Sequence, residues 1–67
     1  MKYVKDNYIW KEIQLYPGDT VSKYGRIIDV DDLGWTIKIT KLSRQYDYNV
    51  GDIIFISHSK SFTFKFM

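Results

Sequence analysis

Strict alternation of apolar and polar residues in Trp35-Thr36-Ile37-Lys38-Ile39-Thr40 most limits what this chain can fold into. This period of two is typical of a β-strand with one buried face. A second β-rich run, Arg26-Ile27-Ile28-Asp29-Val30, precedes it, and the connection Asp31-Asp32-Leu33-Gly34 holds two Asp and a Gly, as short hairpin turns do. We therefore predict that the two runs form a β-hairpin.

The composition extends this prediction to the whole chain. Ile, Val, Thr, Tyr, Phe and Trp, which suit a pleated sheet, supply 29 of the 67 residues, whereas Ala is absent and Leu and Glu are rare. A chain of this length forms one domain with a thin core, and without cysteine it has neither disulfides nor a cysteine zinc site to support that core. We expect an all-β domain over residues 1–67, in which residues 1–7 are a candidate flexible segment.

Turn signals divide the rest of the chain into further strands. Gly18-Asp19 and Gly51-Asp52 each come just before a β-branched run, and we expect both to be turns in which the Asp side chain bonds a nearby backbone N–H. The continuous apolar run 53–56 predicts a central strand covered on both sides. After a polar turn at 58–61, the alternation in 62–66 predicts a final strand that closes the sheet.

The N-terminal third allows two interpretations. The spacing in residues 8–15 favours a strand and also admits a short helix, and Pro17 ends either element. Residues 41–49 form the longest predicted loop. Five short strands joined by tight turns indicate a small closed or nearly closed barrel. Its expected core comprises Ile37, Ile39, Ile54, Phe62, Phe64 and Phe66.

The predicted hairpin resembles a known motif. Gly25-Arg26-Ile27-Ile28-Asp29-Val30, a turn and Trp35-Thr36-Ile37-Lys38-Ile39 are similar to the KOW motif of ribosomal and transcription-elongation proteins. KOW units lie in SH3-like barrels, and Pro17-Gly18-Asp19-Thr20-Val21 resembles the entry to such a barrel. The resemblance covers about residues 17–40 and implies a five-stranded SH3-like barrel. The basic residues that flank the motif's glycine are reduced here to Lys23 and Arg26.

Charge and sequence bias suggest where such a chain would act. Ten Lys and Arg against eight Asp and Glu give a net charge of +2, short of the strong basic character of a dedicated nucleic-acid binder. There is no apolar stretch of membrane-spanning length and no N-terminal signal pattern, so we expect a cytoplasmic protein. Lys outnumbers Arg eight to two and residues with AT-rich codons are common, which suggests a low-GC bacterial or phage origin.

Catalysis is not expected from these residues. His58 is the only histidine, and its neighbours Ser57 and Ser59 do not make a triad by adjacency in sequence, so we interpret it as a solvated turn residue. One histidine without cysteine does not predict a zinc site. The acidic residues at 29–32 lack the alternate ligands and the distal Glu of a calcium loop. We expect no enzyme activity, no catalytic residues, no metal and no cofactor.

A binding role remains, and we expect first a larger protein as the partner, bound through aromatic and arginine side chains of the kind that dominate interfaces. The candidate partner-binding residues are Trp10, Tyr16, Arg44, Tyr46 and Tyr48. Such a protein resembles the small accessory proteins of phages and mobile elements. Self-association into a homo-oligomer is a further alternative.

The alternative partner is nucleic acid, because small barrels bind strands by combining basic side chains with aromatic rings on which bases stack. The candidate residues are Lys23, Tyr24, Arg26, Lys38, Lys41 and Arg44. Interspersed aspartates weaken the positive field around them.

Overall fold

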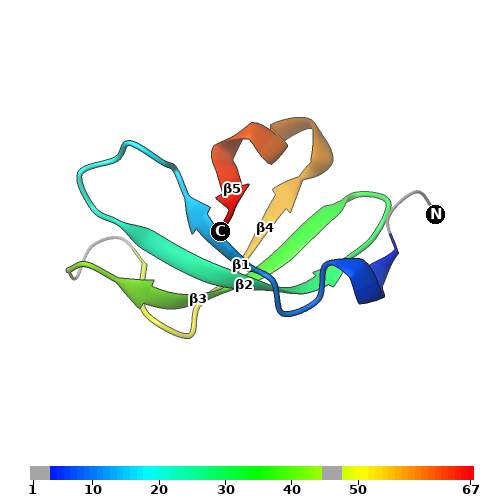
Figure 1. The fold of residues 1–67 in the computed structure, drawn as a ribbon, viewed down its shortest axis with the longest axis horizontal. Coiled ribbons are helices and arrows are strands. Elements are labelled where there is room, and N and C mark those ends of the chain that lie inside the picture. Colours follow the sequence, from blue (N-terminus) through cyan, green and yellow to red (C-terminus); the bar gives the residue numbers. More distant parts are fainter. Residues whose placement is uncertain (1–3, 45–47) are drawn as a thin grey trace.

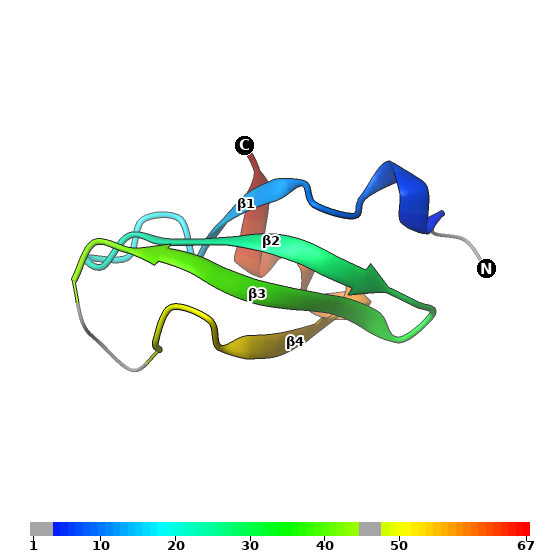
Figure 2. The same ribbon diagram turned by 90° about the horizontal axis from the view of Figure 1, so that it is seen from below.

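The predicted hairpin is the longest pair of strands in the computed structural model, which describes residues 4–44 and 48–67. Strand β2 (Lys23–Val30) pairs antiparallel with β3 (Gly34–Leu42). Ile27 lies opposite Ile37 and Val30 opposite Trp35, and the register shifts after Tyr24 and again after Ile27. The two strands run side by side over most of the length of the domain (Figures 1 and 2).

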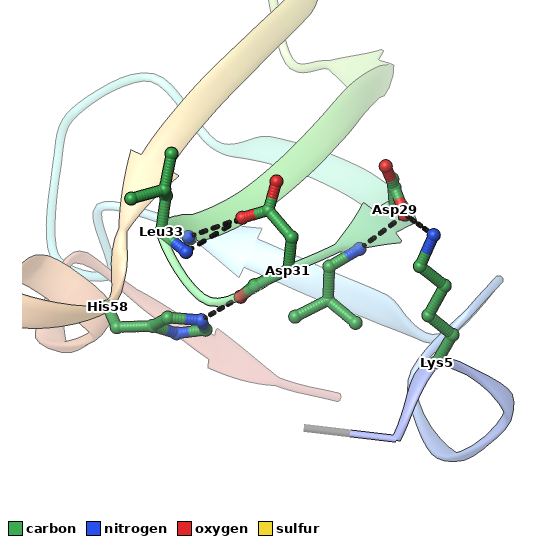
Figure 3. A network of polar contacts seen from close by, with 7 residues as sticks. Lys5, Asp29, Asp31, Leu33 and His58 are labelled. Atoms are coloured by element: carbon green, nitrogen blue, oxygen red, sulfur yellow. Dashed lines mark hydrogen bonds and ion pairs between the residues drawn. The ribbon is translucent and has the colours of Figure 1, made fainter. Parts of the chain in front are cut away.

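The turn of this hairpin is fixed by the carboxylate and the carbonyl of Asp31 (Figure 3). Asp31 Oδ1 accepts hydrogen bonds from the backbone N–H groups of Leu33 at 2.8 Å and Gly34 at 3.0 Å. The Asp31 carbonyl accepts a third from His58 Nε2 at 2.6 Å. The turn is therefore also attached to the segment that follows the fourth strand, and His58 has a structural role there.

Three further strands and two 3-10 helices complete the described chain. Its other elements are η1 (Lys5–Asn7), β1 (Glu12–Leu15), β4 (Ile53–Ser57), η2 (His58–Thr63) and β5 (Phe64–Phe66). All strand pairs are antiparallel, in the order β4-β3-β2-β1-β5. The all-β prediction is confirmed, and the sheet is compatible with a small barrel whose end strands β4 and β5 are joined by η2 (Figure 1). No helix in the described part of the chain is long and apolar enough to cross a membrane.

The core lies on one face of this sheet, where every second side chain points inward. Its buried members are Ile13, Leu15, Ile27, Val30, Trp35, Ile37, Ile39, Ile56 and Phe64. Trp35 is at its aromatic end, with the rings of Tyr8, His58 and Phe64 packed edge-on within 5.1 to 5.6 Å between centroids. Of the predicted core residues, Ile37, Ile39 and Phe64 are buried and Ile54 packs partly buried against them.

The prediction of a central, doubly covered strand at 53–56 is wrong. Strand β4 is at one end of the sheet and pairs with β3 alone. Ile54 and Ile56 face the core, whereas Ile53 and Phe55 are each 54% exposed on the other face. A continuous apolar run does not tell a covered strand from an edge strand with an apolar outer face, because both lack polar alternation.

The predicted strand over 62–66 is shorter in the structure. Helix η2 takes up the expected polar turn and continues to Thr63, so Phe62 lies in that helix and is 81% exposed, and Phe66 in β5 is 45% exposed. Hydroxyl groups stabilise η2, since Ser61 Oγ donates to the carbonyl of His58 and Thr63 Oγ1 donates to the carbonyl of Lys60. Phe62 and Phe66 are therefore not core residues, contrary to the prediction.

Near the N-terminus, the helix and strand alternatives are each present in part. Lys5, in η1, forms an ion pair with Asp29 at 2.9 Å (Figure 3), which attaches this helix to the end of β2. Trp10 has a φ of 69°, in the left-handed region, so the extended backbone of the predicted strand 8–15 begins only after it.

Both Gly-Asp pairs form the expected turns. Gly18 and Gly51 have φ near +95° and +98°, which glycine adopts without strain. The Asp19 and Asp52 carboxylates accept hydrogen bonds from backbone N–H groups one residue after and three residues before them. Asp19 also pairs at 2.6 Å with the ammonium of Lys23, which is 1% exposed.

Truncation of Ile37 and of Phe62 to alanine distinguishes core from surface. Ile37→Ala leaves a cavity in the core and is expected to lower the free energy of unfolding by about 2–5 kcal/mol. Phe62→Ala removes an exposed ring and is expected to change it by less than about 0.5 kcal/mol. Urea unfolding followed by tryptophan fluorescence measures both, and a larger loss for Phe62→Ala would contradict this core.

The ion pair between Asp19 and Lys23 predicts a dependence of stability on pH. Hydrogen bonds from Lys23 and then from the N–H of Thr20 lower the pKa of Asp19 below its usual value. A carboxylate with a lower pKa in the folded state stabilises the protein above its unfolded pKa, and this contribution is lost as the pH falls through the folded pKa. We therefore expect the melting temperature to fall below about pH 4.

Asp19→Asn is expected to lower the melting temperature at pH 7 and to make the fall at acidic pH smaller. Asp29→Asn is the matched control, because the pKa of Asp29 is also lowered, by Lys5, but both side chains of that pair are about half exposed. Its effect at pH 7 is expected to be smaller. Thermal unfolding between pH 2 and 7 tests this, and equal losses for the two variants would contradict it.

Candidate binding surface

The face of the sheet opposite the core carries four of the six residues predicted for nucleic-acid binding. Residues that pair across neighbouring strands lie on the same face, so the register arranges this outer face into rows that cross the sheet. The strand order places β1, β2 and β3 in the middle of these rows.

The first row combines lysines with an aromatic ring. It runs from Lys65 on β5 through Gln14 on β1 and Tyr24 on β2 to Lys41 on β3. Lys41 Nζ lies 5.9 Å from the centroid of the Tyr24 ring, a cation–π contact. Tyr24 is half-buried, and both lysines are exposed.

The second row contains the one arginine of the sheet. It runs from Glu12 on β1 through Arg26 on β2 and Lys38 on β3 to Ile53 on β4. Arg26 Nη2 donates a hydrogen bond to Glu12 Oε1 at 2.7 Å. Lys38 is exposed beside this pair.

A shallow hollow of about 350 Å³ lies between the two rows. Its lining residues are Glu12, Tyr24, Gly25, Arg26, Thr40, Lys41 and Met67. A second hollow of about 250 Å³ shares Glu12 and Met67 with the first and is otherwise lined by Tyr8, Lys11 and Phe66. Together with the rows they form a surface, which we call the basic face, defined by Tyr24, Arg26, Lys38, Lys41 and Lys65.

The basic face is electropositive. Its two rows hold four cations, on Arg26, Lys38, Lys41 and Lys65, against one carboxylate, on Glu12, which is already paired with Arg26. Of the described aspartates expected to weaken the field, Asp29 has its charge balanced by a lysine, whereas Asp52 keeps its charge beyond the end of the second row. Asp29 pairs with Lys5, and Asp52 accepts a hydrogen bond from the backbone of Asn49.

Four of the residues predicted for nucleic-acid binding meet on the basic face, namely Tyr24, Arg26, Lys38 and Lys41. Arg44 is exposed just beyond the end of β3. Lys23 is instead buried, with its ammonium on Asp19 and 5.4 Å from the ring centroid of Tyr16, so it is not part of this surface. Sequence reasoning missed Lys65, although its position between two phenylalanines of an alternating run already placed it on the polar face of a strand.

The residues predicted for a protein partner are more scattered. Trp10 is 62% exposed before β1, and Tyr16 is 37% exposed directly after it. Tyr48 packs partly buried against the core, and Tyr46 lies outside the described residues. Trp10 and Tyr16 both have positive φ values, of 69° and 46°, which are uncommon for large side chains.

Within residues 4–44 and 48–67, the side chains suited to catalysis or metal binding do not form a comparable cluster. Ser57 and Ser59 share a hydrogen bond between their hydroxyl groups, and the ring of His58 is turned toward Asp31 and Trp35. Among the described residues there is no group of three His, Cys, Asp or Glu side chains that could hold a metal ion.

No family model, curated protein or solved structure matches this chain.

Proposed function

We propose that this protein is a non-enzymatic binding module and that the basic face binds single-stranded nucleic acid. The observation that carries the proposal is the first row, in which Tyr24 lies next to Lys41 and is separated from Lys65 by Gln14 alone. Proteins that bind single strands combine cations that follow the phosphates with aromatic rings on which bases stack.

The geometry of Tyr24 and Lys41 suits such a ligand. A base that stacks on the Tyr24 ring would take the place of the Lys41 ammonium, which lies 5.9 Å from the ring centroid. The lysine is exposed and its long side chain can then reach a neighbouring phosphate. Arg26 and Lys38, in the next row, extend the cationic surface along the direction of β2 and β3.

The resemblance of the hairpin to the KOW motif agrees with this proposal. Residues 25–39 supply the turn and most of β2 and β3 and include Arg26 and Lys38. Tyr24 and Lys41 lie on the same two strands, just outside this stretch. Five antiparallel strands with a 3-10 helix before the last one are compatible with an SH3-like barrel. We propose the SH3-like and KOW-like assignments on these grounds.

Titration of fluorescent single-stranded oligonucleotides with the protein at two salt concentrations tests the proposal. We expect salt-sensitive binding that Tyr24→Ala weakens roughly 5- to 140-fold, the range expected for the loss of one stacked base. Lys41→Ala is expected to weaken binding and to reduce the slope of log K against log salt by about 0.7. Lys60→Ala is the matched control, since Lys60 is exposed in η2, away from the basic face.

Three results would contradict the proposal. These are no binding at low salt, equal losses in Lys60→Ala and Lys41→Ala, and binding that Tyr24→Ala leaves unchanged. A duplex of the same length is the comparison ligand, and tighter binding to the duplex would contradict the choice of a single strand.

A protein partner is the second candidate, supported by the exposure of Trp10. Tryptophan is enriched among residues that dominate interface energies, and this one is 62% exposed on a left-handed backbone. A side chain held in solvent at that conformational cost suggests a contact made in a complex. The accessory role for a phage or mobile element belongs to this candidate.

The second candidate is tested by capture from a nuclease-treated lysate of a low-GC bacterium. We expect one stoichiometric protein that binds the wild-type chain and Phe62→Ala, the matched control with a different exposed aromatic ring removed, and that is lost with Trp10→Ala. Two results would contradict it. One is that Trp10→Ala captures the same protein as the wild-type chain. The other is that the wild-type chain captures a protein from an untreated lysate but not from the nuclease-treated one.

A further inference from the structure

We propose that the free edge of β4 pairs antiparallel with β4 of a second copy of this chain, about a two-fold axis that passes beside Phe55. The pairing would join two five-stranded sheets into one. It uses backbone groups of the edge strand, next to the end of the second row at Ile53, and does not depend on the proposed function.

The hydrogen-bond pattern shows which backbone groups of β4 point away from the sheet. Within residues 4–44 and 48–67, β4 pairs with β3 only, and it forms the outer edge in Figure 2. Just beyond the two ends of the pairing, the N–H of Ile39 donates to Asp52 and the N–H of His58 donates to Leu33. Antiparallel bonds alternate along a strand, so the N–H and C=O groups of Ile53 and Phe55 face outward.

This edge lacks the features by which natural sheets avoid edge-to-edge pairing. Such features are lysine or proline on the edge strand, a bulge, or a very short strand. Ile53-Ile54-Phe55-Ile56-Ser57 has no charge and no proline, and its pairing with β3 is regular. By contrast β5, at the other edge, has three residues and carries Lys65.

A two-fold axis beside Phe55 makes the edge complementary to itself. The two Phe55 residues would exchange both of their backbone hydrogen bonds, and Ile53 of each copy would lie opposite Ser57 of the other. Phe55, which is 54% exposed, would then lie against its counterpart, and the equally exposed Ile53 would lie diagonally beside that ring on the same face. The pairing would cover apolar area that the fold leaves in water.

Electrostatics do not oppose a second copy as the occupant. A strand without charge brings no charge repulsion when it pairs with itself. The nearest cation on the same face is Lys38, which lies beside Ile53 on β3. In the paired sheets the two Lys38 positions would be roughly 20 Å apart, given the usual strand spacing and rise, and this exceeds the screening length of about 8 Å at physiological salt.

Sedimentation equilibrium of the full chain over a range of concentrations tests the proposal. We expect the average mass to rise from the 8.0 kDa of the monomer toward about twice that value. In the same range, the Phe55 amide should become protected from hydrogen exchange, as followed by NMR. A mass that stays at 8.0 kDa up to millimolar protein, or a dimer without this protection, would overturn the proposal.

A charge exchange at residue 55 tests the axis itself. Because Phe55 would face its own counterpart, Phe55→Lys and Phe55→Glu are each expected to be monomeric, whereas an equimolar mixture of the two should form dimers. Phe62→Lys, which places the same charge on an exposed ring in η2, is the matched control and should dimerise like the wild type.

Other occupants of the edge would give different results. Dimers that persist in Phe55→Lys alone would assign self-association to another surface and overturn the proposal. A monomer whose Phe55 amide becomes protected only when an oligonucleotide is added would assign the edge to nucleic acid instead. Circular dichroism shows whether the charged variants fold. If neither does, hydrogen exchange at the Phe55 amide of the wild-type protein, measured as a function of concentration, tests the proposal.

Discussion

The register between β2 and β3 is the constraint on which the rest of the structure depends. It places Ile27 opposite Ile37 on the inner face, and the same alternation sends Arg26 and Lys38 outward. One row of pairs therefore builds the core, and the next builds the basic face. A shift by one residue would exchange the two faces and expose the isoleucines. In a chain with so thin a core, stability and the binding surface are specified together.

The two ends of the sheet then have different properties. On the β5 side the outer face carries Lys65 and continues the cationic rows, whereas on the β4 side it carries Ile53 and Phe55. The cationic rows in the middle of the sheet suit a polyanion, and the uncharged edge of β4 suits another β-strand. Pairing through β4 would leave the rows of both copies on the surface of one longer sheet, so the two proposals are compatible without depending on each other.

The sequence predicted what local alternation controls. The all-β class and the hairpin follow from the period of Trp35 to Thr40, and Asp31 makes the turn that its residue type suggests. It did not predict which strand lies at the edge, because the uniform apolar run of β4 carries no information about its neighbours. The burial of Lys23 was also missed, since its partner Asp19 is supplied by the turn before β2. The basic face could not be predicted from the sequence, because it depends on the register that places β5, β1, β2 and β3 next to one another.

The central claim is that the basic face is a binding surface for single-stranded nucleic acid. The most direct measurement is an NMR titration of the isotope-labelled protein with a single-stranded oligonucleotide, read residue by residue. The account predicts that the largest chemical-shift changes fall on Tyr24, Lys41 and Lys65, which come from three different strands. Changes confined to the region around Trp10, or no changes at low salt, would contradict it.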